Sequence, residues 1–203
     1  MTRWYREKKR EHFYKEAKKH GYRARSSYKL KQIQKKYHII REGDYVLDLG
    51  AAPGGWSQVA WEYVGSSGKV IGVDLSRIIP FQDIIFIKGD VTDHSTIEQI
   101  RSILSDHTLD VVLSDMAPNI SGNYSIDHIQ SIYLSTCALS VVELVLKPHG
   151  HFVCKVFMGD TFQEFLDSMK QRFSIVNCYS PPASRKSSSE MYIIGKSFYK
   201  ERL

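Results

Sequence analysis

The sequence predicts an α/β fold with a doubly wound, mostly parallel seven-stranded sheet that ends in an antiparallel C-terminal hairpin. Three observations predict this class. Short apolar runs alternate with helical stretches along most of the chain. These runs are nearly continuous, as expected of strands that helices cover on both faces. The last two runs follow each other without a helix between them, which predicts the hairpin.

The first elements are two basic helices. Residues 5–20 are predicted to form a charged, exposed helix that Gly21 ends. Residues 26–36 resume as a second helix, with Ser26 or Ser27 as its N-cap. Because no repeat or long linker interrupts the pattern, residues 1–203 are interpreted as one domain, with residues 1–24 as a basic N-terminal arm.

Seven strands and four helices are predicted after the second helix. The strands are residues 45–49, 69–75, 83–90, 109–116, 151–157, 174–180 and 190–198. The intervening helices are residues 56–64, 95–106, 125–147 and 160–172. No apolar run approaches the roughly 18 residues of a membrane span, and the charged N-terminus lacks a secretory apolar region. The three cysteines are widely spaced, which predicts neither disulfides nor a metal site and indicates a cytoplasmic protein.

Positive charge is concentrated at the start of the chain. Residues 1–36 hold 14 of the 28 Lys and Arg residues, against three Glu residues, and the rest has an excess of acids. Basic side chains interleaved with tyrosines favour a nucleic acid partner, because they pair with phosphates while the rings stack on bases. The predicted contacts are Arg23, Arg25, Tyr28 and Lys29. A solvated helix or an acidic membrane surface would explain the charge less well.

The turn in LDLGAAPGGWSQ (47–58) is almost free of side chains. Small residues such as Gly50 and Gly54 let the backbone approach a ligand and adopt positive φ. The G-x-G-x-x-G spacing of dinucleotide sites is absent, and Pro53 lacks a backbone donor that a phosphate would use. The turn is therefore suited to close approach more than to anion capture.

Acids at the ends of four predicted strands identify the ligand on this turn. They are Asp48, Asp74, Asp90 and Asp115. Asp74 can accept from both ribose hydroxyls, and Asp90 from an adenine amino group. Because carboxylates favour a positively charged nucleoside over a phosphate, the sequence predicts S-adenosylmethionine as the cofactor.

Two further charged residues come from the last part of the sheet. Lys155 lies inside an apolar strand, where an unpaired ammonium is costly, and Glu190 opens the final strand. Adjacent strands would bring Lys155 near Asp115, and Lys29 could fold over the same cleft. Tyr192 and Lys196 form the Y-x-x-x-K pair of short-chain dehydrogenases, but that pair needs a helix, and these residues lie in a predicted strand.

The set of Lys29, Asp115, Lys155 and Glu190 resembles the K-D-K-E tetrad of the FtsJ-like (RlmE-type) RNA 2′-O-methyltransferases. LDLGAAPGGWSQ, VIGVDL and the GD after the third strand also match, so the likeness covers about residues 22–198. It implies a Rossmann-like methyltransferase fold and S-adenosylmethionine-dependent methylation of a ribose 2′-hydroxyl. Cofactor contacts would fall on Gly54, Trp56, Asp74, Asp90 and Asp115.

The resemblance also implies a role for each tetrad residue. Lys155 would orient the 2′-oxygen and accept its proton if neutral, or stabilise the developing alkoxide if charged. Asp115 would lie near the sulfonium of the cofactor. Lys29 would fix the ribose or a phosphate, and Glu190 would hold Lys155 in place.

The expected substrate is a ribose, that of a uridine, in large-subunit ribosomal RNA, and the expected state is a monomer without membrane contact. A transfer RNA anticodon loop is the alternative substrate. A non-catalytic ribosome assembly factor is the alternative of another class, and the complete tetrad argues against it. A base N-methyltransferase is disfavoured because SDMAPN (114–119) lacks the aromatic residue of an N/D-P-P-Y sequence.

Overall fold

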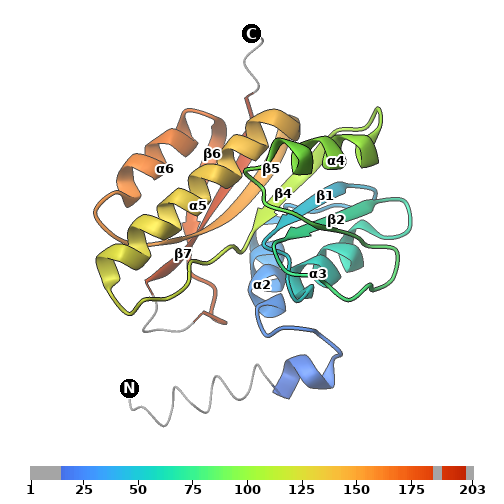
Figure 1. The fold of residues 1–203 in the computed structure, drawn as a ribbon, viewed down its shortest axis with the longest axis horizontal. Helices are drawn as coiled ribbons and strands as arrows, with labels where there is room; N and C mark the ends of the chain where they lie inside the picture. Colours follow the sequence, from blue (N-terminus) through green and yellow to red (C-terminus); the bar gives the residue numbers. More distant parts are fainter. Residues whose placement is uncertain (1–14, 185–188, 200–203) are drawn as a thin grey trace.

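The computed structural model describes residues 15–184 and 189–199 (Figure 1). Residues 15–19 are helical, and the rest of the helix predicted over residues 5–20 lies outside the described residues. Most of the predicted RNA-binding arm, residues 1–24, therefore also lies outside them.

The described chain forms one seven-stranded sheet with five long helices around it. The strands are β1 (Tyr45–Leu49), β2 (Lys69–Asp74), β3 (Ile85–Lys88), β4 (Leu109–Ser114), β5 (Leu146–Phe157), β6 (Phe173–Tyr179) and β7 (Glu190–Phe198). The helices are α2 (Ser27–Tyr37), α3 (Gly55–Val64), α4 (His94–Leu104), α5 (Tyr124–Val145) and α6 (Phe162–Lys170). The predicted order of elements is confirmed, with boundaries shifted by a few residues, most of all at the start of β5.

The sheet has the strand order β3-β2-β1-β4-β5-β7-β6. The first five strands pair in parallel, and β7 pairs antiparallel with both β5 and β6. The predicted hairpin is confirmed, but its second strand inserts between β5 and β6, so β6 is the edge strand. This insertion places the first residue of β7, Glu190, opposite Phe157 at the end of β5.

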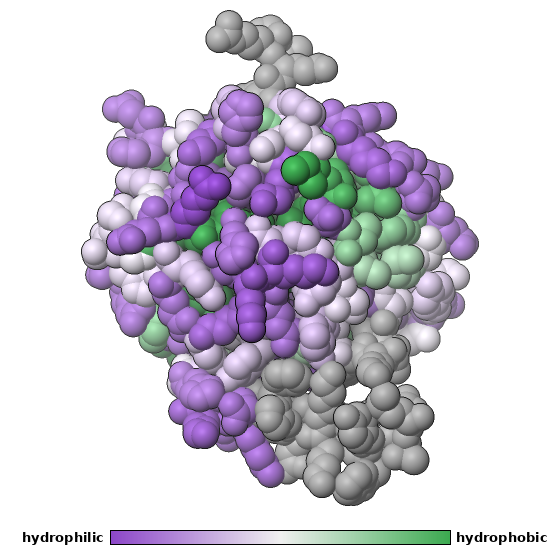
Figure 2. Space-filling view, turned by 180° about the vertical axis from the view of Figure 1, so that it is seen from behind, coloured by the Kyte–Doolittle hydropathy of each residue, from purple (hydrophilic) through white to green (hydrophobic). Residues whose placement is uncertain are grey.

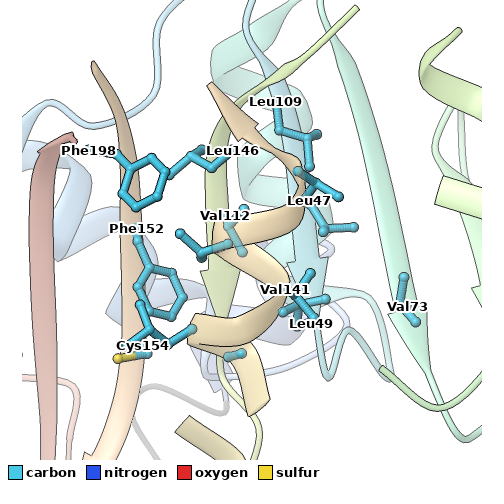
Figure 3. Packing of buried hydrophobic residues seen from close by; sticks show 14 of the residues in the cluster. Leu47, Leu49, Val73, Leu109, Val112, Val141, Leu146, Phe152, Cys154 and Phe198 are labelled. Carbon is cyan, nitrogen blue, oxygen red and sulfur yellow. The ribbon is translucent and has the colours of Figure 1, made fainter. Parts of the chain in front are cut away.

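Helices cover both faces of the sheet, as doubly wound folds require. The larger core packs the sheet against α4, α5 and α6, and Figure 3 shows part of it, with Val141 of α5 beside side chains from the strands. The second core packs the other face against α2 and α3. Hydrophilic residues dominate the face seen in Figure 2, where hydrophobic surface gathers mainly at the upper right.

The long helix α5 is apolar enough, by length and composition, to cross a membrane. However, 44% of its most apolar 18-residue stretch is buried, and Figure 1 shows the helix lying along the sheet. This is the position of a core helix.

The N-terminus of α2 is held by packing contacts and not by the predicted side-chain cap. Ser26 occupies the N-cap position but has helical φ and ψ angles and makes no capping hydrogen bond. Ser27 instead donates from its buried hydroxyl to the Gly55 carbonyl of α3. The prediction of a serine cap was therefore wrong, and Ser27 joins α2 to the helix that follows the glycine turn.

Candidate active site

Lys155 and Asp115 form an ion pair at the carboxyl end of β4 and β5. Nζ of Lys155 lies 3.0 Å from Oδ1 of Asp115 and donates to the Asp115 backbone carbonyl at 2.5 Å. Lys155 and Val153 are two residues apart, so both point to the side of β5 that faces α2 and α3. Only 7% of Lys155 is exposed. Burial alone would raise the pKa of Asp115, but the charges of Lys155 and Lys29 outweigh it and hold that pKa below its usual range.

Lys29 and Glu190 form a second ion pair beside the first. Nζ of Lys29 lies 2.7 Å from Oε1 and 2.8 Å from Oε2 of Glu190, and Ser184 donates to Oε1 at 2.7 Å. Lys29 is 8% exposed, because α2 lays it over the end of the sheet. The structure thus brings the four tetrad residues together, but it is Asp115 that holds Lys155, the role that the sequence analysis gave to Glu190.

Tyr192 lies beneath both ion pairs and was missed as a site residue. It is opposite Lys155 in the β5–β7 register, and its hydroxyl donates to Oδ1 of Asp115 at 2.7 Å. Its ring stacks on Trp56, and Nζ of Lys29 lies 5.7 Å from the ring centre. Burial, together with the charge of Asp115, raises the pKa of Tyr192 well above its usual value, so the hydroxyl remains a donor.

The spacing of Tyr192 two residues after Glu190 was the available signal, because alternate strand residues share a face. The Y-x-x-x-K pair is not a dehydrogenase dyad. Both residues lie in strand β7, and Lys196 donates to the Tyr37 carbonyl at 3.0 Å.

The two ion pairs open onto one cavity of about 200 Å³. It is lined by Arg25, Lys29, Ala117, Ile120, Lys155, Phe157 and Glu190. The predicted RNA contact Arg25 therefore lies beside the tetrad, at a place where a polyanion would meet positive charge.

The other two predicted RNA contacts are engaged within the protein. Arg23 donates to the carbonyls of Pro53, Ile79 and Pro80, at 3.3, 2.6 and 3.2 Å, which ties the glycine turn to the loop after β2. The hydroxyl of Tyr28 lies 2.7 Å from Nδ1 of His20. These contacts indicate that Arg23 shapes the glycine turn, a role that the charge pattern did not predict.

The glycine turn is closely packed around two glycines with positive φ. Gly50 has φ +74°, and a Cβ there would come within 2.6 Å of Cγ of Met116. Gly54 has φ +107°, and a Cβ there would come within 3.2 Å of the Arg23 side chain. Both positions therefore need glycine, as the sequence predicted.

Asp74 and Asp90 stand at the carboxyl ends of β2 and β3, on the same edge of the sheet as the turn. Asp74 accepts from the amides of Ala52 and Ser76, at 2.9 and 2.7 Å, so it fixes the turn directly. Asp90 accepts from the amide and hydroxyl of Thr92, and these bonds lower its pKa. Both groups remain partly exposed.

Asp48 and Trp56 lie deeper than the sequence implied. Asp48 is fully buried and accepts from the Ser57 hydroxyl at 2.7 Å, while its Oδ1 has no hydrogen-bond partner among the described residues. Burial raises the pKa of Asp48 to about 7. The hydrogen bond from Ser57 lowers this pKa, and the charges of Asp115 and Asp74 raise it. Trp56 buries its indole, which donates to the Ser26 carbonyl at 2.9 Å. Its amide lies in the first turn of α3, where backbone N–H groups have no partner within the helix.

These features fit S-adenosylmethionine. Two glycines keep the turn free of side chains, and Asp74, Asp90 and Asp115 lie at or just after the ends of β2, β3 and β4. Within the described part of the chain, one buried oxygen of Asp48 has no hydrogen-bond partner. These negatively charged hydrogen-bond acceptors suit hydroxyl, amino and sulfonium groups better than they suit phosphate.

Comparisons with known proteins agree with this geometry. A family model described as FtsJ-like methyltransferase matches residues 22–198. A protein named ribosomal RNA large subunit methyltransferase E from Methanothrix thermoacetophila is 54% identical over 187 residues, which cover 92% of this chain and 72% of that one. Its namesake from Archaeoglobus fulgidus is 48% identical over 192 residues, which cover 95% of this chain and 98% of that one.

A solved structure supports the same assignment. A crystal structure provisionally assigned as a ribosomal RNA methyltransferase from Plasmodium falciparum superposes with a TM-score of 0.81 at 28% identity, over 89% of this chain and all of that one. The sheet therefore has the Rossmann-like methyltransferase fold. The chain belongs to the FtsJ-like methyltransferase family, whose methyl donor is S-adenosylmethionine.

Proposed function

We propose that this protein transfers a methyl group from S-adenosylmethionine to a ribose 2′-hydroxyl of large-subunit ribosomal RNA. The observation that carries the proposal is the single cavity onto which the Lys155–Asp115 and Lys29–Glu190 pairs both open. Relatives of up to 54% identity that are named ribosomal RNA large subunit methyltransferase E support the choice of substrate. The choice of a uridine as the target remains a prediction from the family resemblance.

We assign the cofactor to the carboxyl edge of the sheet. Gly50 and Gly54 would allow close approach, and the amide of Trp56 would face the ligand. Asp74 would accept from ribose hydroxyls, Asp90 from the adenine amino group, and Asp115 would face the sulfonium end. The bound cofactor supplies an electrophilic methyl group on a positively charged sulfur.

Lys155 is assigned to the reacting oxygen. Two donor positions of its Nζ are directed to the carboxylate and carbonyl of Asp115, which fixes the side chain. The remaining position serves the substrate. There, once the ammonium has released a proton to solvent, the lone pair of Nζ would accept the 2′-hydroxyl proton as the oxygen takes up the methyl group that the cofactor would supply. Asp115 and the Tyr192 hydroxyl hold the amine in place during this transfer.

Lys29 and Glu190 are assigned to substrate positioning. Glu190 holds Nζ of Lys29 through both carboxylate oxygens, so the ammonium stands at the cavity in one orientation. There it would contact the target ribose or an adjacent phosphate, with Arg25 on the same side. Residues 1–24 would extend this basic surface along the RNA, and we propose that the protein acts as a cytoplasmic monomer.

Transfer of radiolabelled methyl groups to unmodified large ribosomal subunits and to bulk transfer RNA tests this function. The RNA is digested to nucleosides after the reaction. Label in 2′-O-methylnucleosides of the large-subunit RNA is the expected result. Label confined to transfer RNA would refute the substrate, and label on a base would refute the chemistry.

A further inference from the structure

The lining of the cavity at the tetrad combines cationic and apolar side chains. Arg25 and Lys29 are the basic residues beside the catalytic lysine, and Ala117, Ile120 and Phe157 are the apolar ones. Ile120 is 65% exposed although it borders the cavity. An exposed isoleucine is not unusual alone, but one at the mouth of a polar site offers a contact to whatever enters.

Tyr124 places an exposed aromatic ring near this cavity. The ring belongs to the first residue of α5 and is 58% exposed. Its hydroxyl donates at 2.5 Å to the carbonyl of Met158, the residue after Phe157 at the cavity. Because this bond fixes the outer end of the side chain, the ring is held at the end of β5, next to the cavity-lining Phe157.

The segment that carries Ile120 and Tyr124 is fixed by hydrogen bonds. Asp127 accepts from the amide and hydroxyl of Ser121, at 2.8 and 2.7 Å, and from the amide of Gly122 at 3.3 Å. Asn123 caps α5 by accepting from the amides of Ser125 and Ile126. The exposed apolar surface is therefore preorganised, which lowers the entropic cost of a contact made there.

Given RNA methyl transfer as the function, we propose that Ile120 and Tyr124 form a base platform, on which an unpaired base of the RNA substrate stacks while its ribose lies at Lys155. Proteins that recognise unpaired RNA combine aromatic faces for bases with basic groups for phosphates. The cavity provides both at once, because Arg25 and Lys29 line it together with Ile120. An apolar protein partner would not account for the two cations beside this surface.

Substitutions at Tyr124 separate stacking from other roles of the residue. Tyr124→Ala is expected to lower kcat/KM for large ribosomal subunits about 5- to 150-fold, which is the range for losing one stacked base. The loss should come through KM, and the affinity for S-adenosylmethionine should stay within about twofold. Tyr124→Trp should restore most of the activity because it keeps a stacking face. Tyr199→Ala, which removes a ring of similar exposure (54%) beyond the end of β7, is the matched control and should leave kcat/KM unchanged.

Three results would overturn the base platform. They are an unchanged kcat/KM in Tyr124→Ala, a Tyr124→Trp variant as impaired as Tyr124→Ala, and a photoreactive benzophenone side chain at position 124 that crosslinks only to ribosomal protein. Crosslinks to large-subunit RNA support it. Wild-type protein that methylates no RNA would refute the proposed function itself, whereas active wild type with an unaffected Tyr124→Ala refutes the platform alone.

Discussion

Nζ of Lys155 is held by both the side chain and the backbone of Asp115, at 3.0 Å from Oδ1 and 2.5 Å from the carbonyl oxygen. The carboxylate is in turn fixed by the Tyr192 hydroxyl. Asp115 thus connects two parts of the site. One is the carboxyl edge of the sheet, to which the cofactor is assigned, and the other is the Lys155 amine, which is assigned to the substrate oxygen.

The rate of methyl transfer should rise with pH if Lys155 accepts the proton. Because the charges of Lys155 and Lys29 hold the pKa of Asp115 low, that carboxylate stays ionised throughout the neutral range and adds no titration of its own. We expect single-turnover rates on large ribosomal subunits to increase about tenfold per pH unit below the plateau. Rates that do not change between about pH 6 and 9 would instead mean that Lys155 acts as an ammonium.

Asp74→Ala should weaken binding of S-adenosylmethionine. The variant loses the carboxylate assigned to the ribose and also releases the amide of Ala52 in the glycine turn. Loss of hydrogen bonds to a charged group predicts a Kd about 10- to 100-fold higher, measured by calorimetry. Asp106→Ala, an exposed residue after α4, is the control. Equal affinities in both variants would remove Asp74 from the cofactor site.

The free energy of unfolding should fall as pH rises from about 4 to 7, because of Asp48. Burial raises the pKa of this carboxyl to about 7 in the folded state, above its value of 3.8 in the unfolded chain. The folded state therefore keeps a proton that the unfolded state releases in this window, so the free energy of unfolding falls with pH and levels off above it.

Asp48→Asn removes that titration. The free energy of unfolding of the variant minus that of wild type should therefore increase by a few kcal/mol from pH 4 to pH 7. Urea denaturation without added cofactor measures this difference. A difference between the two proteins that is constant with pH would show that Asp48 is ionised in both states.

Breaking the Lys29–Glu190 pair should destabilise the fold and also lower the activity. Both side chains are largely buried, so removal of either leaves an uncompensated charge. Glu190→Gln is expected to cost about 3–5 kcal/mol in urea denaturation. Adding Lys29→Met should recover part of that loss, through a coupling of about 1–3 kcal/mol. Strictly additive effects would mean that the pair contributes no interaction of its own.

The sequence predicted the elements well because most of them depend on local patterns. Buried parallel strands leave nearly continuous apolar runs, and Asp74 and Asp115 stand at strand ends that such runs define. The need for glycine at positions 50 and 54 was visible for the same reason, since a turn between a strand and a helix constrains its own residues.

Contacts between distant segments could not be derived in this way. Nothing local specifies that β7 inserts between β5 and β6, yet this insertion puts Tyr192 opposite Lys155. Arg23 was interpreted as an RNA contact because charge patterns do not show that the Ile79 carbonyl lies within reach. Likewise, the choice between Asp115 and Glu190 as the residue that holds Lys155 depends on side-chain geometry alone.

Lys155→Ala, studied for activity and cofactor binding on the same preparation, tests the central claim most directly. Methyl transfer to large-subunit RNA should fall at least about a thousandfold, the scale of losing a positioned general base. The affinity for S-adenosylmethionine should stay within about threefold of wild type, because the carboxylates and glycines of the cofactor edge are intact. Methylation of ribose at a near wild-type rate by this variant would contradict the assignment of the tetrad as the catalytic site.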